Sequence, residues 1–328
     1  MSKDKDLVSI IIPCYNCEAF IEEAVLSCIK QSYDNIEIIC VDNNSKDNTK
    51  YKIKELQLRY PSKVTTAFES KNGAPAARNK GIELAKGDFV HFLDSDDALF
   101  EGAIETLVNN IGDFDGVCGN EYYYQNDFLN KPFKVKKPNI NTSDRFVGIL
   151  DNHPNTSAVL LRAEVFNTIR WEIDLKSGQE KFLWFCIILN QFKFLYVDED
   201  VCKIRVHSSA FRISNQGKKQ LVQNTFVMLE KVDEMYSKNL LLSKSRRLAL
   251  HKHYLIQSYK AICVRNFKYS NMFYEKVDKG LIRTDSEFSY VSREGVSIIF
   301  NPYISYFIFK VKEYVVLLKH RMFGYLKL

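Results

Sequence analysis

The sequence predicts an α/β protein in which a doubly wound mixed sheet is followed by a helical C-terminal region. Short β-branched apolar runs alternate with helical patterns through residues 1–100, and from Gly217 onward the apolar residues keep helical spacing in a basic background. Continuous Val and Ile runs are typical of parallel strands buried on both faces. In such a sheet, ligands bind at the carboxyl ends of the strands.

The predicted elements form two successive units. Residues 7–12 (LVSIII) and 36–41 (IEIICV) are the first two strands, and the segment between them, residues 18–31, has apolar residues three and four apart, which predicts a helix. The second unit is predicted to contain, in order, a helix over 48–60, a strand over 63–69, a helix that opens near Pro75 and a strand over 88–93.

Composition restricts the class of protein. With 328 residues, 46% of them hydrophobic and 26% charged, the chain is long enough for one large globular domain or two smaller ones. A net charge of +6 is mild, and no Lys/Arg run is interleaved with aromatic residues, so nucleic acid is not expected as a partner. The N-terminus lacks the apolar stretch of a signal peptide, which together with scattered cysteines predicts a reducing, cytoplasmic setting.

Cys14 and Cys17 have the C-x-x-C spacing of a zinc knuckle or a redox pair. A tetrahedral zinc site needs a second Cys/His pair at suitable spacing, and the nearby segments supply none. A cysteine site is therefore not expected.

Polar side chains follow three of the predicted strands. Three carboxylates within four residues repel one another unless a cation offsets them, and hard oxygen ligands select Mg²⁺ or Mn²⁺. An ion held by few carboxylates completes its shell with substrate phosphates, which indicates a nucleotide diphosphate. The alternative is that the aspartates only cap a helix starting at Ala98. The polar groups are Tyr15 and Asn16 after the first strand, Asp42 after the second, and Asp94, Ser95, Asp96 and Asp97 after the strand over 88–93.

The segments 13–49 and 72–97 closely resemble the inverting family 2 glycosyltransferases of the GT-A fold. Four motifs of that family occur in order: P-x-Y-N, V-D-x-x-S-x-D, A-R-N-x-G and D-x-D. The resemblance covers roughly residues 7–212. It implies a GT-A catalytic domain over 1–212, with a nucleotide-sugar half at about 1–100 and an acceptor half at about 101–212. Residues 213–328 would then form a helical region with a basic aromatic tail.

The resemblance also implies roles for individual residues. Asp42 would accept a hydrogen bond from the nucleotide base, Arg78 would approach the donor phosphate or sugar, and Asp96 would bind the metal. Cys14 and Cys17 fall at positions that the family pattern leaves free, so they are expected to be buried fillers. The donor-binding set is Pro13, Tyr15, Asn16, Asp42, Arg78, Asp94, Ser95, Asp97 and Arg205.

Glu180 occupies the position of the catalytic base, where the family more usually has Asp. An inverting transfer needs one carboxylate to take the proton from an acceptor hydroxyl as its oxygen attacks the anomeric carbon. His207 is implied as a second metal ligand or a diphosphate contact, and Arg205 as a phosphate contact. Ordinary structural roles remain alternatives: a turn for Asp42, a solvated helix face for Arg78, a first-turn acid for Glu180 and a structural histidine for His207.

The C-terminal segment 301–328 is aromatic and basic, with charges that interrupt its apolar runs before they could span a bilayer. It is predicted either to lie on an anionic membrane surface, on the inner face of the cell membrane, or to pack as a helix on the protein or on a second subunit. The tyrosines within residues 120–125 either line an acceptor groove or belong to edge-strand packing. Homo-oligomer formation is left open.

The sequence therefore predicts a metal-dependent inverting glycosyltransferase that uses Mn²⁺ or Mg²⁺ and a UDP-sugar. Its acceptor would be a glycan or lipid-linked glycan of bacterial surface polysaccharide or lipopolysaccharide assembly, by family analogy. The alternative is a non-catalytic sugar-nucleotide-binding or scaffolding subunit. Retention of Asp94, Asp96, Glu180 and His207 together argues against that alternative. A nucleotidyltransferase is disfavoured because no Gly-rich loop follows the first strand, and a paired-carboxylate hydrolase because it has no use for the metal cluster.

Overall fold

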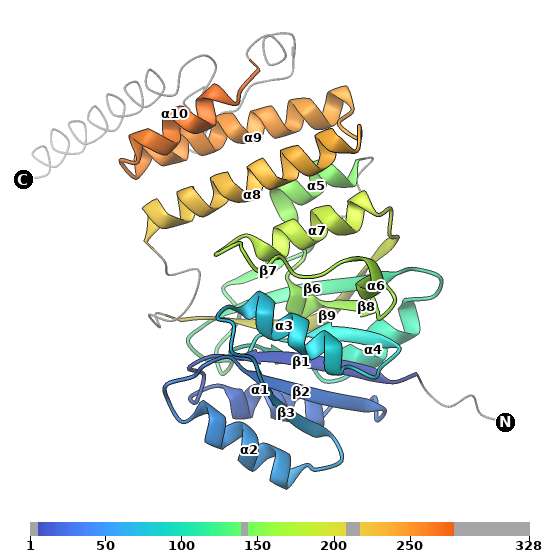
Figure 1. Cartoon of the computed structure of the whole chain (residues 1–328). Helices are drawn as coiled ribbons and strands as arrows, with labels where there is room; N and C mark the ends of the chain where they lie inside the picture. The colour runs from blue at the N-terminus through green and yellow to red at the C-terminus, as the bar shows by residue number, and fades with distance from the viewer. Residues whose placement is uncertain (1–5, 139–143, 208–216, 279–328) are drawn as a thin grey trace, which may run out of the picture. The chain divides into compact units, whose positions relative to one another are not determined.

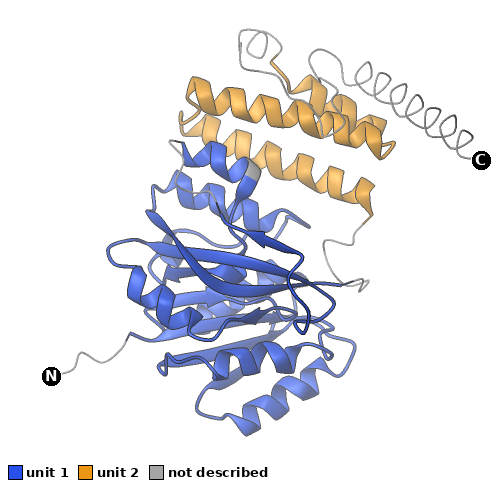
Figure 2. Cartoon of the chain, turned by 180° about the vertical axis from the view of Figure 1, so that it is seen from behind, with its two compact units in different colours: residues 1–215 blue, residues 216–328 orange. Residues whose placement is uncertain are grey.

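The computed structural model describes residues 6–138, 144–207 and 217–278 (Figure 1). The chain divides into two compact units, residues 1–215 and 216–328 (Figure 2). The boundary predicted at residue 212 lies outside the described residues.

The first unit is built on a mixed sheet. Its strands follow the order β3-β2-β1-β4-β8-β6-β9-β5, and β7 pairs with β6. The strands β1, β2, β3 and β4 are parallel, whereas β8 runs antiparallel to both β4 and β6. The bounds are β1 (Val8–Cys14), β2 (Ile36–Asp42), β3 (Val64–Phe68), β4 (Phe89–Phe92), β5 (Ala98–Leu99), β6 (Gly116–Gln125), β7 (Lys134–Lys136), β8 (Val159–Arg162) and β9 (Phe194–Val206).

Helices accompany this sheet. A core of buried apolar side chains joins β1, β2 and β4 to the buried faces of α1 and α4. On α3, Gly81 allows close approach to β1, because a Cβ at Gly81 would lie 2.3 Å from Ile11 Cγ2. The helices are α1 (Ile21–Ile29), α2 (Thr49–Arg59), α3 (Ala74–Leu84), α4 (Ala103–Asn110), α5 (Arg145–Asn152), α6 (Val165–Thr168) and α7 (Gln179–Leu189), with the 3₁₀ turn η1 (Thr156–Ala158).

The predicted strands and helices of residues 7–93 are confirmed, and so is the mixed α/β sheet. Cys14 and Cys17 are buried, as expected of fillers, and both are free thiols. The interpretation of Asp94–Asp97 as a helix cap is wrong. Ala98 and Leu99 form β5, which pairs with β9, and the next helix begins only at Ala103 after Gly102, without a side-chain cap.

His91 on β4 is fully buried, and burial lowers its pKa from 6.5 to about 4. The unfolded state therefore binds a proton at a higher pH than the folded state does. We expect the free energy of unfolding to fall as pH drops from 6.5 toward 4, by up to about 3 kcal/mol from this group. Urea unfolding of the wild type and of His91→Leu across this range measures the contribution, and parallel pH profiles for the two proteins would contradict it.

The second unit is helical in its described part. It contains α8 (Lys218–Lys238), α9 (Lys244–Cys263) and α10 (Phe267–Glu275), whose buried faces share aromatic contacts such as Phe226–Phe273. None of the helices in the described part of the chain is both long enough and apolar enough to cross a membrane. The predicted basic aromatic tail lies outside the described residues.

Candidate active site

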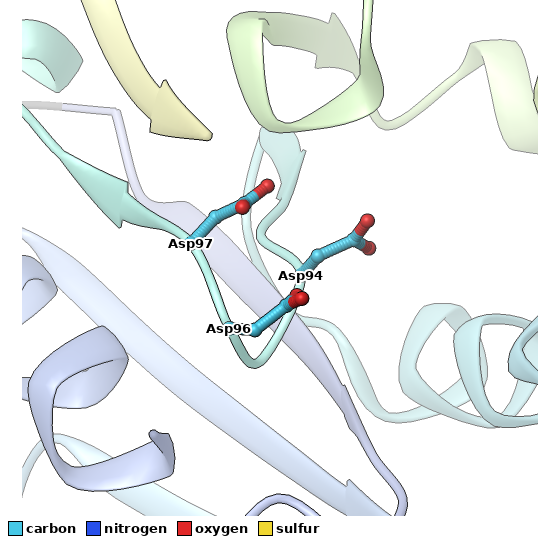
Figure 3. A group of neighbouring side chains, drawn as sticks. All are labelled: Asp94, Asp96 and Asp97. Carbon is cyan, nitrogen blue, oxygen red and sulfur yellow. The ribbon is translucent and has the colours of Figure 1, made fainter. Parts of the chain in front are cut away.

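The ends of three parallel strands meet at one edge of the sheet. Register pairs Cys14 on β1 with Asp42 on β2, and Ile11 on β1 with Phe92 on β4. The loop after β4 carries three aspartates, whose carboxylate oxygens lie within 4.8 Å of one another (Figure 3). The structure therefore brings together the strand ends that the sequence predicts as the donor site.

Hydrogen bonds link the loops after β1 and β2. The backbone N–H of Asn16 donates to Ser45 Oγ at 3.1 Å, and Asn16 Oδ1 accepts from the backbone N–H of Lys46 at 2.7 Å. Asn16 has a left-handed backbone, with φ of 47°, which suits asparagine better than most residues. Through these contacts, Asn16 stabilises the loop after β1 against the loop after β2. Pro13 is buried at the end of β1, and Tyr15 is 46% exposed.

Asp42 is only 4% exposed, and its Oδ1 accepts a long 3.4 Å hydrogen bond from the Ser45 backbone. The neighbouring Asn43 holds the chain that leads into α3. Its Nδ2 donates to the carbonyls of Glu69 and Lys71, at 2.9 and 2.8 Å, and its Oδ1 accepts from the Gly73 backbone. Asn43 thereby fixes the start of the helix that carries Arg78.

Arg78 extends from α3 toward the acidic loop. Its Nη2 lies 2.5 Å from Asp94 Oδ1, and its guanidinium stacks over the Trp171 ring at 4.5 Å. Arg78 is 8% exposed, so it is not the solvated helix arginine that the sequence left as an alternative. Arg78 therefore places a buried positive charge beside the carboxylate cluster.

The three aspartates differ in environment. Burial raises the pKa of Asp94, and repulsion from Asp96 and Glu180 adds to the rise, although Arg78 opposes it. The pKa of Asp97 is raised well above its usual range by burial and by the other two aspartates. Carboxylates that resist ionisation in this way are stabilised by a bound cation.

Asp96 and Asp97 have different partners. Asp96 Oδ2 lies 2.9 Å from His207 Nε2, and the side chain of Asp96 keeps 21% of its surface exposed. Asp97 is 2% exposed, and its two oxygens accept hydrogen bonds from Ser157 Oγ at 2.9 Å and from the Arg205 backbone at 3.0 Å. Asp96 is thus available to a ligand, whereas the contacts of Asp97 indicate that it positions the loop. Ser95 lies between Asp94 and Asp96 and is half-buried.

Arg205 on β9 is buried among protein groups. Its guanidinium donates to the carbonyls of Asp96 and Asn126 at 2.9 and 2.7 Å, contacts the Glu23 carboxylate, and stacks over Phe128 at 4.1 Å. Its assignment to a donor phosphate stays a prediction, and these contacts indicate that it holds the acidic loop in place.

Glu180 lies in the first turn of α7. Its Oε1 accepts from the Thr156 backbone N–H at 2.5 Å, and its Oε2 lies 3.5 Å from His153 Nε2. Burial alone would raise the pKa of Glu180, but His153 and the Thr156 N–H outweigh it and lower the pKa to about 2. With 28% of its side chain exposed, Glu180 is an ionised carboxylate that can meet a substrate.

The residues present fit a divalent metal. Asp96 and His207 already converge at 2.9 Å, the Asp94 carboxylate lies beside them, and the cluster has an excess of negative charge. Carboxylate oxygen with one imidazole nitrogen suits Mn²⁺ at least as well as Mg²⁺.

The sequence did not single out three residues that the structure joins to this site. They come from segments whose position depends on the sheet rather than on local pattern. The run HPNTS over 153–157 could have indicated a structured turn at this position, because Asn and Ser favour local hydrogen bonds between side chain and backbone. The three residues are His153, Ser157 and Trp171.

The family model for glycosyl transferase family 2 matches residues 9–170. Glycosyltransferase GlyG of Streptococcus pneumoniae is 39% identical over 133 residues, which are 40% of this chain and 44% of GlyG. The minor teichoic acid biosynthesis protein GgaB of Bacillus subtilis is 28% identical, over 64% of this chain and 24% of GgaB.

The Escherichia coli protein named UDP-Glc:alpha-D-GlcNAc-diphosphoundecaprenol beta-1,3-glucosyltransferase WfgD is 38% identical, over 32% of this chain and 41% of WfgD. The chain spans less than half the length of each of these three relatives.

Two solved structures share the fold. Residues 1–349 of TarS from S. aureus, in complex with UDP-GlcNAc, match with a TM-score of 0.65 and 18% identity, over 84% of this chain and 83% of that 1–349 chain. Mannosyltransferase PcManGT from Pyrobaculum calidifontis, in complex with GDP-Man and Mn²⁺, matches with a TM-score of 0.53 and 16% identity, over 82% and 78%. The mixed sheet thus has the fold of these GT-A glycosyltransferase structures, and residues 9–170 of the chain match glycosyl transferase family 2.

Proposed function

We propose that the protein is a metal-dependent inverting glycosyltransferase that moves a sugar from a UDP-sugar to an acceptor hydroxyl. One observation carries the proposal. Ser157 donates a hydrogen bond to Asp97 of the acidic loop, and the adjacent Thr156 donates its backbone N–H to Glu180. A single rigid turn therefore connects a cation-attracting cluster to an ionised carboxylate, which are the two parts that such a transfer requires.

In the proposed mechanism, the donor nucleotide lies across the strand ends. Asp42 accepts a hydrogen bond from the base ring, with Pro13 and Tyr15 beside it, and the Arg78–Asp94 pair orients the ribose and phosphates. Asp96 and His207 would hold the metal, which when bound neutralises the charge of the departing diphosphate. Glu180 takes the proton of the acceptor hydroxyl while that oxygen attacks the anomeric carbon opposite the leaving group, so the anomeric configuration inverts.

The relatives support the donor and the class of acceptor. WfgD is named for a UDP-linked glucose and a diphosphoundecaprenol-linked sugar, GgaB for teichoic acid biosynthesis, and TarS was solved with UDP-GlcNAc. We therefore propose a UDP-sugar donor and a lipid-linked or polymer glycan acceptor of the bacterial surface. Work on such an acceptor would take place at the cytoplasmic face of the membrane.

Calorimetric titration of the purified protein with UDP, GDP and CMP, each with Mn²⁺ and with EDTA, tests the donor site. We expect UDP to bind with Mn²⁺ and to lose that binding in EDTA, because the acidic cluster repels the diphosphate without a cation. Binding of GDP in place of UDP would show that the donor is a GDP-sugar and not a UDP-sugar. Absence of binding by all three nucleotides would favour the scaffolding alternative.

A further inference from the structure

His153 lies directly beside the proposed base, at the end of α5. Its Nε2 is 3.5 Å from Glu180 Oε2, while the other oxygen of Glu180 is held by the Thr156 backbone at 2.5 Å. The two side chains keep 25% and 28% of their surfaces exposed. The carboxylate is therefore fixed from two sides and still open to an incoming hydroxyl.

The backbone of His153 is anchored by a buried ion pair. Lys136 Nζ on β7 donates to the His153 carbonyl at 2.5 Å and lies 3.2 Å from the carboxylate of Glu121 on β6. Glu121 is fully buried, and it also accepts from the Asn155 backbone and the Tyr123 hydroxyl, each at 2.7 Å. The cost of burying this ion pair is offset because each carboxylate oxygen of Glu121 has a hydrogen-bond partner. The anchor fixes the backbone from which the imidazole extends.

Charged groups approach His153 from each packed element. Glu180 faces it from α7, Lys136 from β7 and Glu121 from β6, and the Lys181 ammonium binds the Leu150 carbonyl on α5. Of these groups, Glu180 is the one in contact with the ring. A protonated His153 would pair with that carboxylate and weaken it as a base, whereas a neutral ring would offer a nitrogen lone pair.

We propose that His153 is the positioning residue of the base: it orients the Glu180 carboxylate and receives, through Glu180, the proton of the acceptor hydroxyl. The inference rests on the proposed function. In the step, the hydroxyl O–H bond breaks and its proton passes to Glu180, while the oxygen bonds to the anomeric carbon. The electron pair of the broken C–O bond leaves with the diphosphate. The proton then moves from Glu180 to neutral His153 Nε2.

This arrangement answers a chemical difficulty at Glu180. A carboxylate is a weak base toward a sugar hydroxyl. A neutral imidazole behind it gives the proton a more basic site and restores the ionised carboxylate. Activity should therefore fall as pH decreases and His153 becomes protonated, which gives the pH profile an acid limb.

The test uses the full-length chain and needs no identified acceptor. Release of UDP from UDP-glucose or UDP-GlcNAc, with water as the acceptor, is followed from about pH 5 to about pH 9, where histidine changes charge. The variants are His153→Ala, which removes the contact, and His153→Gln, whose amide N–H can still donate to the carboxylate without titrating. His251→Gln in the second unit is the matched control.

We expect His153→Ala to lower kcat by about 10–100-fold with little change in the donor KM. His153→Gln should recover part of kcat but lose the acid limb. Unchanged kcat and an unchanged acid limb in both variants would overturn the proposal, as would a loss of donor binding in both, which would mean a structural role. If the wild type binds UDP and releases UDP from the UDP-sugar, and both His153 variants have the same kcat and pH profile as the wild type, only the proposed role of His153 is wrong. If the wild type neither binds UDP nor releases it, the proposed function fails as well.

Discussion

Glu180→Gln should abolish sugar transfer while leaving donor binding intact. The amide is nearly isosteric with the carboxylate and can still contact Thr156 and His153, so the local structure should survive. It cannot accept the proton of the acceptor hydroxyl, and loss of a general base costs about 10²–10⁴-fold in rate. Transfer assayed at saturating UDP-sugar, with calorimetric UDP binding measured in parallel, separates the two effects.

Two further variants sharpen this test. Glu164→Gln removes an exposed carboxylate near α6, so it controls for the change in net charge. Glu180→Asp restores the residue that the family more usually has here, with a shorter reach, and should keep part of the activity. Full transfer activity in Glu180→Gln would show that Glu180 is not the base.

Asp96→Asn should remove metal-dependent donor binding. Asp96 is the aspartate of the cluster that is both partly exposed and joined to His207, at 2.9 Å, so it is the carboxylate best placed to hold an ion. Losing a direct ligand should weaken UDP binding in Mn²⁺ by more than the roughly 10–100-fold that changes around a metal site cost. Calorimetry with UDP at several Mn²⁺ concentrations measures the change.

Asp113→Asn, at an exposed aspartate, is the matched control for the lost charge. The Asp97→Asn variant gives a contrasting result, because Asp97 is buried against Ser157 and the Arg205 backbone. We expect it to lower thermal stability as well as binding. If Asp96→Asn bound UDP and Mn²⁺ as tightly as the wild type, the metal site would have to be reassigned.

Local sequence was sufficient to predict the strands and helices of residues 7–93. Continuous apolar runs such as residues 36–41 indicate a strand that is buried on both faces of the sheet. Such a run can be recognised from a few adjacent residues. The convergence of Asp42 and Asp94 also followed from sequence, because the carboxyl ends of neighbouring parallel strands share one edge.

The aspartates of the loop after β4 show what the sequence could not predict. Asp96 and Asp97 are chemically identical neighbours, and only packing separates the half-buried carboxylate beside His207 from the one enclosed by Ser157 and Arg205. The strand over Ala98 and Leu99 was missed for a related reason. Two residues form a strand here because β9, about a hundred residues later, offers them backbone partners.

The sequence by itself determined the class of fold, the strand ends that meet and the types of side chain at them. Only the tertiary structure decided which of those groups are exposed, and which partners from distant segments surround them. His153, Ser157 and Trp171 reach the site because antiparallel pairing inserts β8 between β4 and β6. Pairing of that kind depends on contacts between residues far apart in the chain, so no local spacing or propensity encodes it.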